Sequence, residues 1–99
     1  MKYCVYFLLS LKDKKFYIGY TSKNPEVRLE KYHNRGLVKS TKYRQPFILC
    51  YYEIYNNKKT ALKREFYLKQ TGGYREKIII VNLIKQTEEE KLPIIIKKY

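Results

Sequence analysis

Side chains with the chemistry to act on a phosphate group lie at intervals along the first two thirds of the chain. They are two phenols, a guanidinium and a carboxylate, provided by Tyr6, Tyr17, Arg28 and Glu65. A guanidinium can hold a phosphate through two parallel hydrogen bonds. A carboxylate is an oxygen ligand suited to Mg²⁺ or Mn²⁺. A phenol has an unperturbed pKa of about 10, and it becomes a base at neutral pH only where a metal ion or cations lower that pKa.

The two tyrosines belong to a predicted β-hairpin over residues 3–20. Two apolar runs, residues 5–9 and 16–18, are rich in strand-forming side chains, and a polar segment separates them. Gly19 follows Tyr17 after a single isoleucine. Tyrosine is also an ordinary strand residue, and the chain has 12 of them, so the hairpin alone leaves a purely structural role open.

Arg28 belongs to a predicted helix over residues 25–36, which begins with an asparagine cap, a proline and an acid and ends near a glycine. In a continuous helix Tyr32 would lie about 40° from Arg28 around the axis, and His33 about 140° away. Helix geometry therefore favours Tyr32 over His33 as a second site residue. A lone histidine on a helix is also more often a satisfied polar residue.

A basic loop follows this helix and precedes the next strand. Its cations and its aromatic side chain are Lys39, Lys42, Tyr43 and Arg44. Such a mixture suits phosphate contacts and base stacking, although a charge run is more often only a solvated surface.

Glu65 belongs to a predicted helix over residues 58–71, which follows a buried strand predicted over residues 47–55. The apolar stripe of this helix consists of Ala61, Leu62, Phe66 and Leu68, and Glu65 lies among them. A carboxylate in such a stripe is costly unless it is paired or bound to a cation. The alternative to a metal ligand is an ion pair with Arg28 or Lys69.

The C-terminal third is less informative. The run over residues 78–81 has strand propensity, within a segment of residues 74–85 that periodicity leaves ambiguous. In the tail, residues 86–99, Pro93 breaks any helix. The final isoleucine-rich segment either adds an edge strand or contacts another chain.

The whole chain of 99 residues indicates one domain, over residues 1–99. Lys and Arg total 22 against 9 acids, a net charge of +13, which favours nucleic acid as partner over a membrane. A compositional bias of the source is the alternative. No apolar run approaches the roughly 18 residues of a membrane span, and Cys4 and Cys50 lie in strand-like runs as reduced core residues. We therefore expect a cytoplasmic protein.

Four of these features resemble the GIY-YIG nuclease family, in family order. Cys4-Val5-Tyr6 keeps only the tyrosine of the first triplet, and Tyr17-Ile18-Gly19 is an intact second triplet. The run from Arg28 to Gly36 is similar to the Arg-Leu-x-x-His-Asn-x-Gly of small stand-alone, excinuclease-subunit-like members, with one extra residue before the histidine. Residues 61–69 resemble the region that carries the family's metal-binding glutamate. The likeness covers about residues 3–85.

The resemblance implies a compact α/β domain with a small three-stranded sheet flanked by helices, including a helix over residues 74–85. It implies cleavage of nucleic acid phosphodiesters, of DNA more than RNA, with one Mg²⁺ or Mn²⁺ at Glu65. Arg28 would hold the phosphate, Tyr6 would act as general base, and Tyr17 would position the water or share its proton. The remaining implied site residues are Tyr32 or His33 on the first helix, Gly19 and Asn82 in support, and Lys69 with the basic loop on the nucleic acid.

Two alternatives remain open at this point. One is a catalytically inactive module of the same fold that binds nucleic acid. The other is a small basic accessory protein whose aromatic strands contact a protein partner. The preferred substrate structure and the oligomeric state are not predictable from these residues.

Overall fold

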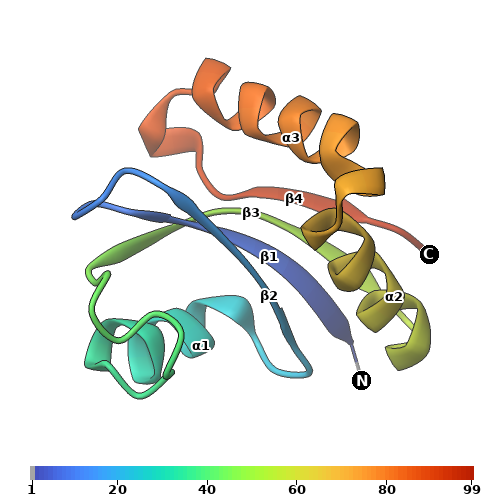
Figure 1. The fold of residues 1–99 in the computed structure, drawn as a ribbon. Helices are drawn as coiled ribbons and strands as arrows, with labels where there is room; N and C mark the ends of the chain where they lie inside the picture. The colour runs from blue at the N-terminus through green and yellow to red at the C-terminus, as the bar shows by residue number, and fades with distance from the viewer. Residues whose placement is uncertain (1) are drawn as a thin grey trace.

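A four-stranded sheet runs through the middle of the molecule, as Figure 1 shows for the computed structural model, which describes residues 2–99. Its strands are β1 (Tyr3–Ser10), β2 (Phe16–Thr21), β3 (Phe47–Tyr55) and β4 (Ile94–Lys97). They lie in the order β2-β1-β3-β4, antiparallel except for the parallel pair β3 and β4. The predicted α/β class is confirmed. The predicted count of three strands was wrong, because the C-terminal tail adds β4 at the edge.

The helices lie on both sides of this sheet. They are α1 (Pro25–Lys31), α2 (Lys58–Lys69) and α3 (Tyr74–Gln86). Short 3-10 turns follow each of them, at His33–Arg35, Thr71–Gly73 and Glu89–Lys91. In Figure 1 α1 and α3 lie on opposite sides of the sheet. The chain needs α2 and α3 as the crossover between β3 and β4, since parallel strands cannot be joined by a tight turn.

Each face of the sheet has its own hydrophobic core. The face toward α3 is packed by side chains of β1, β2, β3 and both later helices: Val5, Phe7, Ile18, Tyr51, Ala61, Leu68, Ile80, Val81 and Ile84. The face toward α1 is packed by Cys4, Tyr6, Leu8, Phe47, Leu49 and Tyr52. Successive residues of β1 alternate between the two cores, so Tyr6 points toward α1 and its neighbours Val5 and Phe7 point toward α3.

A bulge in β3 changes this alternation. Phe7 pairs with Tyr51 but Leu8 pairs with Leu49, so Cys50 is an extra residue in β3. As a result Leu49 and Tyr52 lie in the same core although they are three positions apart. Cys4 and Cys50 are both buried and free, as predicted.

The helices correct the boundaries predicted from the sequence. The α-helical part of the first helix ends at Lys31, five residues before the glycine that was taken as its end. Gly36 instead closes the 3-10 turn, with a positive φ of 71°. The ambiguous run over residues 78–81 is helical within α3, because Ile80, Val81 and Ile84 share the face that packs on the sheet. Within residues 2–99 no helix combines the length and the apolar character that a membrane crossing requires.

Candidate active site

The side chain of Tyr6, in β1, extends across β2 at Gly19, which is its partner in the strand register. A Cβ at Gly19 would lie 2.5 Å from both Cζ and Oη of Tyr6, and 2.9 Å from Cε2 of Tyr17. The phenol of Tyr6 therefore needs a residue without a side chain at this position. This close approach explains why glycine follows the second tyrosine at this spacing, and it brings the rings of Tyr6 and Tyr17 to a centroid distance of 6.4 Å.

His33 is the hydrogen-bond partner of Tyr6, with 2.7 Å between Oη and the histidine Nε2. On the other side of the ring, Nδ1 lies 2.9 Å from Oγ1 of Thr41. The Thr41 hydroxyl donates to the carbonyl of Val38, so it accepts from Nδ1–H. In the tautomer with its proton on Nδ1, Nε2 accepts the Tyr6 hydroxyl proton. The sequence analysis named His33 but not Thr41.

The electrostatics of the Tyr6–His33 pair keep both groups neutral. Burial, and then the Arg28 cation, lower the pKa of His33 to about 4. Burial raises the pKa of Tyr6 by more than Arg28 lowers it. Both side chains are almost fully buried, at 0% exposure for His33 and 1% for Tyr6. At neutral pH the structure therefore holds a phenol that donates to a neutral imidazole.

The end of α1 is what brings His33 to Tyr6. Tyr32 leaves the helical path with φ −124° and ψ −62°, and the chain continues as a 3-10 turn. Asn34 fixes this turn to the start of β3: its amide accepts from the Phe47 N–H at 2.7 Å and donates to the Phe47 carbonyl at 3.0 Å. Tyr32 lies beside Arg28 as the helix geometry predicted, but the assumption of a continuous helix was wrong, and the 3-10 turn brings His33 to Tyr6.

Arg28 lies in the last turn of α1, near the Tyr6–His33 pair. Its guanidinium carbon is 4.8 Å from the centroid of the Tyr32 ring, a cation–π contact. Its Nε is buried and has no hydrogen-bond partner among residues 2–99. Tyr32 therefore supports the guanidinium, which lies close enough to Tyr6 to oppose the rise in the pKa of its phenol.

Glu65 lies on α2, which packs against β1 and β2. Its side chain is 20% exposed, and Oε2 accepts from Lys69 Nζ at 2.9 Å. The same ammonium group lies 5.5 Å from the centroid of the Tyr17 ring, and the Glu65 carboxylate is close enough to raise the pKa of Tyr6. The ion pair with Lys69 that the sequence left open is present, and the structure shows none with Arg28 among residues 2–99.

Glu65 is the carboxylate near Tyr6 that could hold a divalent cation. Within residues 2–99 no group of three or more His, Cys, Asp or Glu side chains forms a closed metal cage. Oε1 of Glu65 accepts no hydrogen bond from these residues. The i,i+4 pair with Lys69 is half-exposed and stabilises by only about 0.5 kcal/mol, so it does not hold the carboxylate against a divalent cation. One carboxylate that leaves most positions to water and phosphate is typical of Mg²⁺ sites.

A buried carboxylate that the sequence analysis overlooked fixes the helix that carries Glu65. Glu53 of β3 is 0% exposed. Its two oxygens accept from the hydroxyls of Tyr51 and Tyr55 at 2.6 and 2.7 Å and from Arg64 of α2 at 2.9 and 3.0 Å. Although burial raises the pKa of Glu53, these hydrogen bonds leave it below its ordinary value. Arg64 is the residue before Glu65, so this contact sets where α2 sits on the sheet.

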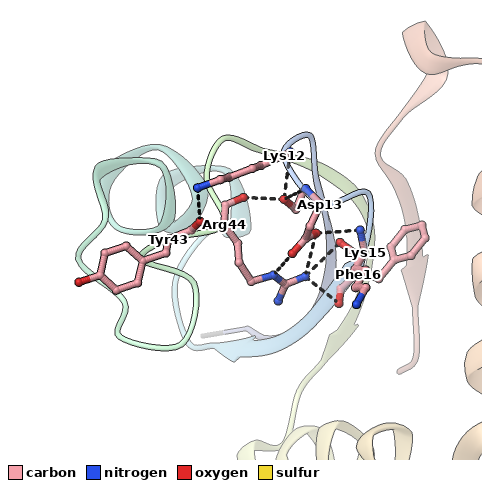
Figure 2. A network of polar contacts seen from close by, with 7 residues as sticks. Lys12, Asp13, Lys15, Phe16, Tyr43 and Arg44 are labelled. Atoms are coloured by element: carbon pink, nitrogen blue, oxygen red, sulfur yellow. Dashed lines mark hydrogen bonds and ion pairs between the residues drawn. The ribbon is translucent and has the colours of Figure 1, made fainter.

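The basic loop is only partly free to bind a ligand. Figure 2 shows Arg44 turned toward the β1–β2 turn, where its Nε donates to Asp13 Oδ2 at 2.7 Å and its Nη2 donates to the Lys15 carbonyl at 3.2 Å. Lys12 Nζ donates to the Tyr43 carbonyl at 3.0 Å. The Arg44 guanidinium, predicted to contact phosphate, is therefore engaged within the fold. The side chains of Lys39, Lys42 and Tyr43 are exposed.

Asn82 is not brought to the site. It lies on the outer face of α3 beside Ile79, Leu83 and Gln86. The inner face of α3 covers the side of the sheet opposite Tyr6. The family resemblance implied that Asn82 supports the site, whereas α3 directs its side chain toward Ile79, Leu83 and Gln86.

Comparison with known proteins agrees with this geometry. The family model described as the GIY-YIG catalytic domain matches residues 2–78, most of the chain. The chain belongs to the GIY-YIG family. A UPF0213 protein of Clostridium perfringens is 35% identical over 86 residues, covering 86% of this chain and 91% of the relative. UPF0213 proteins of Staphylococcus aureus are 44% identical over 64 residues, covering 64% of this chain and 76% of the relatives.

The solution NMR structure of a UPF0213 protein from Bacillus halodurans is 30% identical, covers 84% of this chain and 85% of its own chain, and has a TM-score of 0.48. In this GIY-YIG chain the first triplet is reduced to its tyrosine. Cys4 packs in the core on the α1 side, whereas Tyr6 makes the contacts with Gly19 and His33.

Proposed function

We propose that this GIY-YIG protein is a metal-dependent endonuclease that hydrolyses phosphodiesters of nucleic acid, DNA in preference to RNA. The observation that carries the proposal is the hydrogen bond between the Tyr6 hydroxyl and neutral His33, beside the Arg28 guanidinium. A tyrosine that only packed in the core would need neither the imidazole nor the cation. The family and the net charge of +13 support a polyanionic substrate.

The Tyr6–His33 hydrogen bond provides an acceptor for the phenolic proton, which a neutral tyrosine must lose to act as a base. Tyr6 can take a proton from water only if its own proton has somewhere to go, and His33 Nε2 is already its acceptor. As Oη accepts a proton from the attacking water, the phenolic proton passes to Nε2, which leaves a neutral phenol and an imidazolium. The water oxygen bonds to phosphorus, the bond to the leaving oxygen breaks, and that oxygen takes a proton from solvent.

Arg28 couples substrate binding to this proton transfer. When no phosphate is bound, burial lowers the pKa of His33 most, and the positive charge of Arg28 lowers it further. A phosphate held by the guanidinium brings negative charge that offsets the repulsion, so the pKa of His33 rises when substrate is bound. The imidazole becomes a better proton acceptor only when there is a phosphodiester to cut.

Glu65 would hold a Mg²⁺ or Mn²⁺ ion. When bound, such an ion neutralises the charge that builds on the non-bridging oxygens. Lys69 would then leave the carboxylate and contribute its charge to the nucleic acid, and the Tyr17 hydroxyl would orient the attacking water.

The experiment is a cleavage assay with end-labelled duplex, branched and single-stranded substrates, in Mn²⁺ and in EDTA. We expect the wild type to cut at least one substrate in Mn²⁺ and none in EDTA. Tyr6→Phe should lose activity, whereas Tyr74→Phe, at an exposed position of α3, should keep it. If the wild type binds every substrate and cuts none, the protein is the inactive binding module instead.

A further inference from the structure

An exposed strip on α2 combines lysines with apolar side chains that do not pack in the core. It consists of Lys58, Lys59, Leu62, Lys63 and Phe66, which line a shallow groove; we call it the α2 strip. Phe66 is 64% exposed and Leu62 is 38% exposed. The sequence analysis placed both in the buried stripe of this helix, which was wrong, because Ala61 and Leu68 alone face the core.

The α2 strip begins beside the proposed metal ligand. At about 100° per residue, Leu62 and Phe66 lie about 60° and 100° around the helix axis from Glu65. Lys59 and Lys63 follow in the same direction at about 120° and 160°. The buried residues of α2 lie on the other side of Glu65. Lys58 lies on the same side of Glu65, at about 20°, so a strand whose phosphate is held near Glu65 meets lysines on both sides of the apolar pair.

The charges on the α2 strip are free. No ion pair within residues 2–99 involves its three lysines. A second copy of this chain would bring a net charge of +13 against them, which disfavours self-association through this surface. Three cations around an exposed aromatic ring instead complement a polyanion that carries flat apolar groups, which is nucleic acid.

We propose that the α2 strip binds the nucleic acid strand next to the scissile phosphate, with its lysines on phosphates and an unstacked base on Phe66. A base within a continuous duplex keeps both faces stacked and offers none to Phe66. The strip therefore gives preference to substrates with an unpaired arm beside the cut. This inference rests on the proposed function for the location of the scissile phosphate, but strand binding itself requires no cleavage.

The test measures binding of the full chain in EDTA, so that no cleavage takes place. Fluorescence anisotropy compares a blunt duplex with a duplex that carries a single-stranded arm of about ten nucleotides. We expect Phe66→Ala to weaken binding of the armed substrate about tenfold, the loss of one stacked base, and to change blunt-duplex binding by less than about twofold. Ile79→Ala, at an exposed position of α3, is the matched control and should change neither.

Two further comparisons separate stacking from charge. An arm of abasic nucleotides should bind wild type and Phe66→Ala equally, because it has no base to stack. Changing Lys59 and Lys63 together to Gln should weaken both substrates and flatten the dependence of affinity on salt.

The proposal is overturned if Phe66→Ala binds the armed substrate as tightly as Ile79→Ala does. It is also overturned if the wild type is a dimer that Phe66→Ala converts to a monomer, since the strip would then be an interface between copies. Absence of cleavage by the wild type, with arm preference intact, would instead contradict the proposed function and leave the strip as a binding surface.

Discussion

Acidification should destabilise the fold through His33, the one histidine of the chain. Its pKa is about 4 in the folded protein and 6.5 ordinarily, so between these values the unfolded chain binds a proton that the folded chain excludes. Stability is therefore complete above about pH 6.5 and is lost as the pH falls toward 4. For these two pKa values the free energy of unfolding decreases by about 2.5 kcal/mol between about pH 8 and pH 4.5.

Two measurements check this prediction. Because there is one histidine, its ring signals in an NMR titration need no assignment, and they should show a pKa about two units below 6.5 and a proton on Nδ1 at neutral pH. Urea unfolding should show the stability loss in the wild type and not in His33→Gln, whose side chain does not titrate. A ring that titrates near its ordinary pKa, or equal acid losses in the two proteins, would refute the buried Tyr6–His33 pair.

Two other substitutions test how the site is positioned. Arg64→Met should lower the free energy of unfolding by about 3 kcal/mol, because it leaves the buried Glu53 carboxylate without its cation. Glu53→Gln should cost less, because Arg64 keeps its ion pair with Glu76; the double variant should lose less than the sum, and additive losses in urea unfolding would disprove the coupling. Gly19→Ala should slow cleavage at least about tenfold by displacing the Tyr6 ring. Gly72→Ala is its control, since nothing lies within 4 Å of the added carbon, and equal rates for both variants would contradict the role of the close approach.

The parts of the fold predicted from the sequence depend on local patterns. The hairpin follows from two apolar runs around a polar turn, and Asn24 and Asn57 cap the helices where capping rules place them. The bulge at Cys50 had no local sign, because it only becomes visible when β3 pairs with β1. The fourth strand likewise depends on a partner distant in the sequence.

The candidate site was predictable by residue type and less so by geometry. His33 contacts Tyr6 because the chain changes from α-helix to a 3-10 turn after Lys31. Sequence periodicity does not reveal this change. The argument that a carboxylate in an apolar run is costly was applied to Glu65, which turned out to be partly exposed. The same argument applied to the apolar run 47–55 would have found Glu53, the acid that is fully buried.

The most direct test of the proposed site is cleavage by Glu65→Gln, measured together with nucleic acid binding and stability. The substitution keeps the size of the side chain, removes its charge and costs at most about 0.5 kcal/mol, because only the half-exposed pair with Lys69 is lost. We predict that cleavage collapses, that added Mn²⁺ does not restore it, and that nucleic acid binding and the unfolding midpoint stay close to those of the wild type. Cleavage by Glu65→Gln at the wild-type rate, or cleavage by the wild type in excess EDTA, would contradict the single-metal site.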